Sequence, residues 1–103
     1  MTQDSFDYVI VGGGSAGCVL ANRLSASGEY SVCLLEAGPE DRSLFIDIPG
    51  AFAYFMFSKK YNWGFDADQV PDIRDGSPIF CPQGKTLGGG SAINAMIYIR
   101  GNH

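Results

Sequence analysis

The sequence has few charged residues, and those present carry a small negative excess. Asp, Glu, Lys and Arg make up 17% of the 103 residues, and 7 basic against 11 acidic side chains give a net charge of −4. Binding to a nucleic acid backbone requires a basic surface, so this composition excludes nucleic acid as a partner. With 46% hydrophobic residues, the chain is also too apolar for an intrinsically disordered protein.

A long hydrophobic run is also lacking, since no apolar stretch approaches the roughly 20 residues that span a bilayer. Residues 1–7 are polar and acidic, without the basic start and apolar middle of a secretory signal. We therefore expect a cytoplasmic protein. The short apolar run 51–57 leaves two interpretations open: packing beneath a neighbouring domain, which is favoured, or peripheral contact with the inner membrane.

Metal-binding side chains are scarce. The three cysteines, Cys18, Cys33 and Cys81, are widely spaced and form no CxxC pair, and His103 is the only histidine. This pattern does not fit a structural zinc site. We expect no metal and three reduced cysteines that pack as small apolar residues.

Glycine, in contrast, is abundant at 14 residues, and its first cluster lies in a recognisable order of elements. An apolar strand is predicted over residues 6–11, a glycine turn over 12–17, a helix ending near Gly28, and a second strand over 31–36. The strands have the continuous apolar character of strands buried on both faces. The residues expected on the apolar face of the helix are Ala16, Val19, Leu20 and Leu24.

The spacing Gly12-x-Gly14-x-x-Gly17, answered by Glu36 at the end of the next strand, is typical of a dinucleotide site. Gly12 permits the tight turn, Gly14 lets a pyrophosphate approach the backbone, and Gly17 allows close packing of helix on strand. The helix N-terminus offers N–H donors to phosphate, and Glu36 can accept hydrogen bonds from ribose hydroxyls. These features leave both NAD and FAD open.

Between residues 37 and 80 the periodicity disappears, which predicts a long excursion without regular structure. A second glycine-rich segment, 84–91, then leads into an apolar run. Ser91 is a candidate N-cap for a helix over 92–100, with Ile93, Met96, Ile97 and Arg100 on one face.

Four segments resemble the glucose–methanol–choline (GMC) flavoprotein oxidoreductases: 7–24, 34–39, the tripeptide 61–63, and above all 84–101. The resemblance spans almost the whole chain and is closest to bacterial alcohol and choline dehydrogenases. It implies an α/β fold, with a Rossmann-like FAD-binding βαβ unit and an extended loop excursion, within a larger two-domain GMC fold. Residues 1–103 are then the N-terminal part of the FAD-binding domain, joined to the remainder of the same polypeptide or to a companion chain.

The resemblance also implies which residues bind FAD. The first glycine segment and the acidic residue hold the ADP half, and the second segment passes along the pyrophosphate and flavin. Trp63 is a candidate wall near the adenine, with simple core packing as the alternative. The residues implied are Gly12, Gly14, Ser15, Ala16, Gly17, Glu36, Ala37, Trp63, Thr86, Gly88, Gly89, Ser91, Asn94, Ala95 and Met96.

Three positions depart from the family pattern. Gln83 stands where relatives usually have Arg, and Gly90 where they usually have Ser. Ile93 stands where some members have a His linked to the flavin, so we expect FAD to be bound non-covalently. In this family the catalytic base lies far downstream, so no catalytic residue is expected in this chain, His103 included.

The implied function is oxidation of the CH–OH group of an alcohol to an aldehyde, by hydride transfer to FAD, with quinone or oxygen as the acceptor. Two alternatives remain. The same fold serves hydroxynitrile lyases and a light-driven decarboxylase, and a truncated product would be an FAD-binding module without activity.

Overall fold

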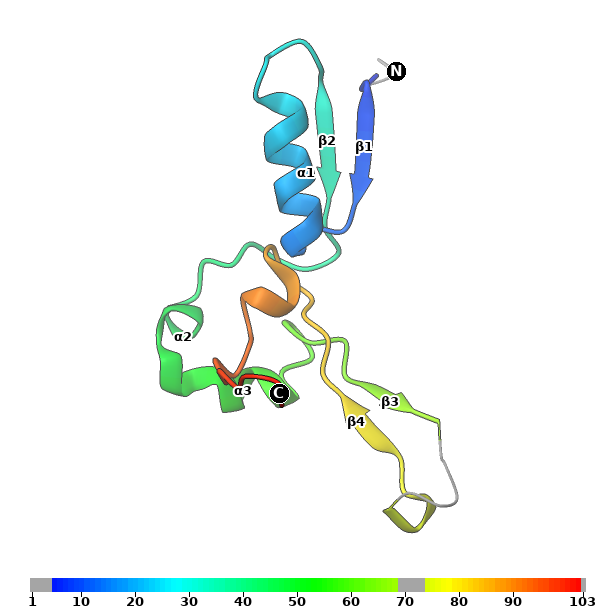
Figure 1. Ribbon diagram of the computed structural model, residues 1–103, viewed down its shortest axis with the longest axis vertical. Helices are drawn as coiled ribbons and strands as arrows, with labels where there is room; N and C mark the ends of the chain where they lie inside the picture. The colour runs from blue at the N-terminus through cyan, green and yellow to red at the C-terminus, as the bar shows by residue number, and fades with distance from the viewer. Residues whose placement is uncertain (1–4, 69–73, 103) are drawn as a thin grey trace.

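A computed structural model describes residues 5–68 and 74–102. The molecule is extended, measuring 54 × 35 × 29 Å, with a βαβ unit at one end and a β-hairpin at the other (Figure 1). Its radius of gyration is 17.4 Å, against about 13 Å for a compact domain of this size. Within the described ranges only Phe55 and Tyr61 are buried apolar side chains. The chain therefore presents surfaces to its surroundings more than it encloses a core.

The predicted βαβ unit is confirmed. Strands β1 (Tyr8–Val11) and β2 (Val32–Leu35) pair in parallel, in a register that sets Tyr8 opposite Val32 and Val11 opposite Leu35. Helix α1 (Ser15–Ser25) joins them and packs against both. Both strands point their carboxyl ends at the same glycine turn, below which the rest of the chain lies (Figure 1).

The face that α1 turns to the sheet differs from the predicted one. Gly17 is buried there, and a side chain at Gly17 would overlap the carbonyl oxygen of Gly12. Of the four residues predicted on the packed face, Leu24 is half-buried, while Ala16, Val19 and Leu20 are exposed. The prediction was wrong for these three because the helix approaches the strands through a small residue, whereas an apolar pattern points to the large ones.

The strands form, but their predicted burial on both faces is not seen in the described chain. Val9 is 57% exposed and Val11 is 83% exposed. Helix α1 covers one side of this sheet of two strands, and among the described residues no other element packs on its second face (Figure 1). The apolar side chains of that face are therefore exposed.

Regular structure also forms within the segment predicted to be an irregular excursion. Two antiparallel strands make a hairpin, short helices precede it, and one 3₁₀ turn lies between its strands. Their bounds are α2 Leu44–Asp47, η1 Pro49–Ala51, α3 Phe52–Phe57, β3 Phe65–Ala67, η2 Arg74–Gly76 and β4 Ile79–Cys81. The small core lies here, where the ring of Phe55 meets that of Tyr61 edge-on at 5.3 Å.

The helix predicted over 92–100 is absent. The structure has one 3₁₀ turn, η3 (Gly89–Ser91), followed by irregular chain. The side chain of Asn94 donates to the carbonyl of Ser91 at 2.6 Å and accepts from the N–H of Met96 at 2.8 Å. Such local side-chain bonds compete with the helical ladder. Met96, at φ 53°, then turns the chain out of the helical region.

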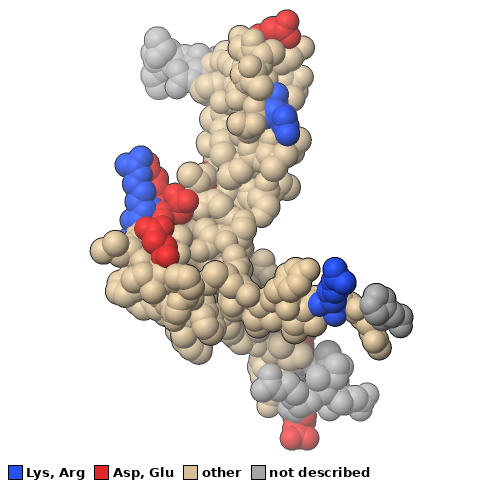
Figure 2. Space-filling view, turned by 60° about the vertical axis from the view of Figure 1, so that its left-hand side comes forward, with Lys and Arg blue, Asp and Glu red and all other residues tan. Residues whose placement is uncertain are grey.

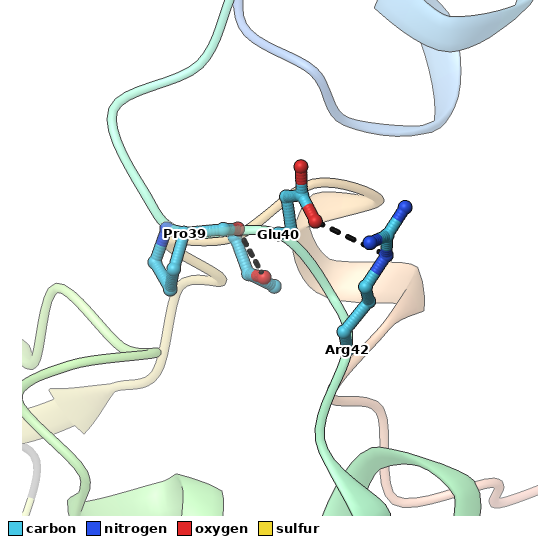
Figure 3. A network of polar contacts seen from close by, with 4 residues as sticks. Pro39, Glu40 and Arg42 are labelled. Carbon is cyan, nitrogen blue, oxygen red and sulfur yellow. Dashed lines mark hydrogen bonds and ion pairs between the residues drawn. The ribbon is translucent and has the colours of Figure 1, made fainter.

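The surface carries few charges. Figure 2 shows basic and acidic side chains in small separate groups on a largely uncharged surface. One such group is the Arg42–Glu40 ion pair, with 3.1 Å between Nε and Oε2 (Figure 3), which is exposed and therefore contributes little to stability. No helix in the described residues has the length and apolar content needed to cross a bilayer.

Candidate cofactor site at the carboxyl ends of the parallel strands

The first glycine turn has the geometry that its sequence predicts. Gly12 has a φ of +99°, which a side chain would oppose, and its N–H donates to the carbonyl of Leu35 at 2.7 Å. Gly14 precedes α1 in an extended conformation, and no atom of the described chain lies within 4 Å of the Cβ it would carry. The first N–H groups of α1 have no partner inside the helix. The turn therefore offers open space beside N–H donors.

Glu36 braces this turn. Its Oε2 accepts from the N–H of Gly13 at 2.7 Å, and its Oε1 accepts from the N–H of Gly38 at 2.8 Å. A carboxylate has about four lone-pair positions, so each oxygen retains capacity for a further donor. The predicted interaction with ribose hydroxyls is compatible with this arrangement, and Glu36 also has a structural role that the motif does not indicate.

The second glycine segment meets the first, although the two are far apart in sequence. The N–H of Gly88 donates to the carbonyl of Gly13 at 2.7 Å. The hydroxyls of Ser15 and Ser91, 76 residues apart, lie at 2.7 Å. Gly89, at φ +56°, lies so close to Gly14 that its Cβ would be 2.9 Å from the Gly14 Cα. This close approach therefore requires a glycine at position 89, whereas a side chain at position 14 would point into open space.

A cavity of about 540 Å³ opens where the two segments meet. Six of the predicted site residues line it: Gly12, Gly14, Glu36, Ala37, Trp63 and Gly89. Also on its wall are Val11, Leu35, Gln83, Gly84 and Gly90. The cavity thus lies at the carboxyl ends of β1 and β2, the edge at which open α/β sheets bind ligands.

Trp63 forms one wall of this cavity and is 46% exposed in the described chain. Its ring stacks on that of Phe65, with centroids 5.8 Å apart and planes 7° apart. The Nζ of Lys85 lies 4.6 Å from the centroid of the Trp63 ring, within the range of a cation–π contact. These two contacts hold the Trp63 ring in place. Trp63 and Lys85 also line a second cavity, of about 290 Å³.

Thr86 is fully buried, and its hydroxyl donates to the carbonyl of Pro39 at 2.8 Å (Figure 3). The N–H of Leu87 donates to the same carbonyl at 3.0 Å. Together they tie the second glycine segment to the chain that leaves β2. The resemblance implies a cofactor contact for Thr86, and in this structure its side chain faces the protein.

Other predicted residues lie apart from the large cavity. Asn94 and Met96 line a separate cavity of about 100 Å³, together with apolar side chains of α2 and α3. Ala16 is exposed in the first turn of α1, and Ala95 is half-buried and lines none of the three cavities. His103 lies outside the described residues.

Sequence reasoning missed several residues that build the site. Side chains at Gly38 and Gly84 would overlap the backbone at Lys85 and at Gly89, respectively. Asn62 is buried and makes four hydrogen bonds. No local motif marks these residues, because their partners are distant in sequence; the only available signal was the number of glycines outside the two fingerprints.

The three residues that depart from the family pattern each line a cavity. Gln83 and Gly90 both lie on the wall of the large cavity, and Ile93 lines the small one. Cys18, Cys33 and Cys81 are free thiols. Among residues 5–68 and 74–102, His, Cys, Asp and Glu form no group that could hold a metal ion.

Comparisons with known proteins show the family of this chain. The model of the GMC oxidoreductase family matches residues 6–103. An oxygen-dependent choline dehydrogenase of Vibrio vulnificus (strain YJ016) is 57% identical over 100 residues, which cover 97% of this chain and 18% of that protein. An alcohol dehydrogenase [acceptor] of Pseudomonas putida is 56% identical over 97 residues, which cover 94% and 17%.

The fold is shared with solved structures as well. Pyridoxine 4-oxidase from Mesorbium loti superposes with a TM-score of 0.81 at 38% identity, over 94% of this chain and 19% of that one. The chain thus spans about a fifth of the length of these relatives. It belongs to the GMC oxidoreductase family.

Proposed function

We propose that residues 1–103 are the N-terminal part of the FAD-binding domain of an enzyme that oxidises the CH–OH group of an alcohol to an aldehyde. One observation carries the proposal: two glycine segments distant in sequence meet at the carboxyl ends of β1 and β2, around one cavity. The cofactor prediction is confirmed for the family, because GMC oxidoreductases are FAD-binding flavoproteins.

The residues of the cavity fit an ADP-containing cofactor. Pyrophosphate needs N–H donors and an approach without side chains, which Gly12, Gly14 and the start of α1 provide. Ribose hydroxyls need an acceptor, which Glu36 provides at the end of β2. A flat ring system needs an apolar wall, which Trp63 provides on the lining of the same cavity. We assign these residues to FAD on that basis.

The second glycine segment would lie along the pyrophosphate and flavin. Gly89 and Gly90 present bare backbone to the cavity, so a planar group can lie close to it. Ser91 holds Ser15 by its hydroxyl, which fixes the two segments relative to each other. Ile93 offers no nucleophile, so FAD is bound without a covalent link, and acid precipitation should release all of the yellow colour into the supernatant.

In the reaction, bound FAD would serve as the two-electron acceptor, taking those electrons as a hydride from the alcohol carbon. The described residues bind and orient that cofactor. The base that removes the hydroxyl proton comes from the remainder of the polypeptide or from a companion chain. Choline and simple primary alcohols are the first substrates to test, because relatives of this chain are named for choline and for alcohols.

The test uses the full-length protein that contains this chain, purified with FAD and kept anaerobic. Addition of choline or a primary alcohol should bleach the visible absorption of the flavin and yield the aldehyde. Bound FAD that no alcohol reduces would contradict the alcohol oxidation. Turnover that needs light, or cleavage of a cyanohydrin without bleaching, would indicate the non-redox alternatives.

A further inference from the structure

Asn62 connects three segments through one buried side chain that is only 3% exposed. Its Nδ2 donates to the carbonyls of Phe55 at 3.2 Å and Met56 at 2.9 Å, in α3. Its Oδ1 accepts from the N–H of Gly64 and the N–H of Gln83, both at 2.9 Å. Both donor hydrogens and both lone pairs of the amide are therefore used.

The backbone strengthens this connection. The N–H of Trp63 donates to the carbonyl of Gln83 at 2.9 Å, and the N–H of Lys85 donates to the carbonyl of Tyr61 at 2.8 Å. Asn62 and Gly84 thus form an antiparallel bridge outside any named strand. Residues 83–85 are held to residues 61–63, which follow α3.

Gly84 links the segment held by Asn62 to the cofactor site through close backbone contacts. A side chain at Gly84 would overlap the backbone of Gly89 and Gly90, and Gly89 in turn lies against Gly14. Gln83 and Gly84 lie on the wall of the large cavity themselves. A shift of residues 83–85 would therefore move the second glycine segment relative to the first.

We propose that Asn62 is a positioning residue that holds the second glycine segment against the first and so sets the shape of the cofactor cavity. The inference rests on the proposed function, because the cavity must bind FAD for its shape to matter. An amide is needed here since the side chain must donate on one side and accept on the other. Ala leaves four backbone groups, each buried or partly buried, without this partner, and an ionised Asp sets negative charge against two carbonyls.

The experiment compares Asn62→Ala and Asn62→Asp with Asn22→Ala, which alters an exposed asparagine of α1, in the full-length protein. Three quantities are measured: the FAD dissociation constant by fluorescence titration, the visible circular dichroism at saturating FAD, and the thermal midpoint of the apoprotein. Both Asn62 variants should raise the dissociation constant by about tenfold or more and change the dichroism of the bound flavin. Asn22→Ala should leave all three unchanged.

Gly84→Ala provides a second test if the Asn62 variants do not fold. Its methyl group would displace the backbone of Gly89 while the side-chain amide of Asn62 stays intact. It should weaken FAD binding by a similar factor, while Gly50→Ala, a change at a glycine with open space around its Cβ, should not. Variants that lower the thermal midpoint but keep the wild-type affinity and dichroism would overturn the proposal and leave Asn62 a structural residue. A wild-type protein that binds no FAD would instead overturn the proposed function.

Discussion

The two glycine segments of this chain look alike in sequence but obtain their shapes in different ways. The first, residues 12–17, lies between a strand and a helix, and both neighbours are adjacent in the chain. The second, residues 84–91, is held by Asn62, by the Pro39 carbonyl and by the first segment, all of them distant. In the first segment, glycine is required mainly by the local geometry of the strand, turn and helix. In the second segment, glycine is required because another backbone approaches closely. Substitutions at matched positions can test this difference.

The largest effect is expected at Gly17. A methyl group there overlaps the Gly12 carbonyl oxygen, so Gly17→Ala should lower the free energy of unfolding by about 3 kcal/mol. Gly14→Ala should be tolerated by the fold, because the space around that Cβ is open. Denaturant titration of the two variants measures the difference in stability.

The same pair separates folding from binding. Gly14→Ala should weaken FAD binding, because the added methyl group stands where we place the pyrophosphate. Wild-type FAD affinity in the Gly14→Ala variant would show that the first glycine segment does not bind the pyrophosphate. Equal stability of the two variants would show that helix α1 does not approach the strands as described.

The next effect compares neighbours in the second segment. Gly89→Ala must adopt a φ of +56° and place its methyl group 2.9 Å from the Gly14 Cα, so we expect a loss of about 2 kcal/mol. At Gly90 the space around the Cβ is open, and Gly90→Ala should change stability by less than about 0.5 kcal/mol. Thermal unfolding of both variants checks this. Similar losses at the two positions would mean that the second segment does not pack on the first.

A smaller effect is expected at Thr86. Thr86→Val keeps the shape and removes the hydroxyl bond to Pro39, whose carbonyl retains the N–H of Leu87. Stability should fall by about 1 kcal/mol, and the FAD dissociation constant should stay within about twofold. A much larger change in FAD affinity, measured by fluorescence titration, would show that Thr86 contacts the cofactor, as the resemblance implies.

The smallest effect lies at the far end of the βαβ unit. Backbone and side-chain hydrogen bonds from Ser31 hold the pKa of Asp7 below its ordinary value of 3.8. Its charged form therefore stabilises the fold above that pH, and the contribution is lost as the pH falls through the lowered pKa. At neutral pH the thermal midpoint of the wild type should be slightly higher than that of Asp7→Asn. This difference in thermal midpoint should disappear well below pH 3.8. A difference that is constant with pH would exclude this explanation.

The difference between the two glycine segments also decides which features could be predicted from the sequence. The βαβ unit could be predicted, because Gly12, Gly17 and the flanking apolar strands act over short distances. The helix after Ser91 could not be excluded, since its apolar spacing is helical and the competing bonds of Asn94 depend on a local conformation set by the second segment. The roles of Asn62, Gly38 and Gly84 depend on contacts across the fold, which no spacing rule detects.

A crystal structure of the full-length protein with FAD bound tests most directly whether the two glycine segments form one wall of a single cofactor site. We expect one arrangement: the pyrophosphate beside the open face of Gly14, a ribose hydroxyl on Glu36, and the contact between Ser15 and Ser91 preserved. FAD bound elsewhere, or the two segments separated with the cofactor touching only one of them, would contradict it.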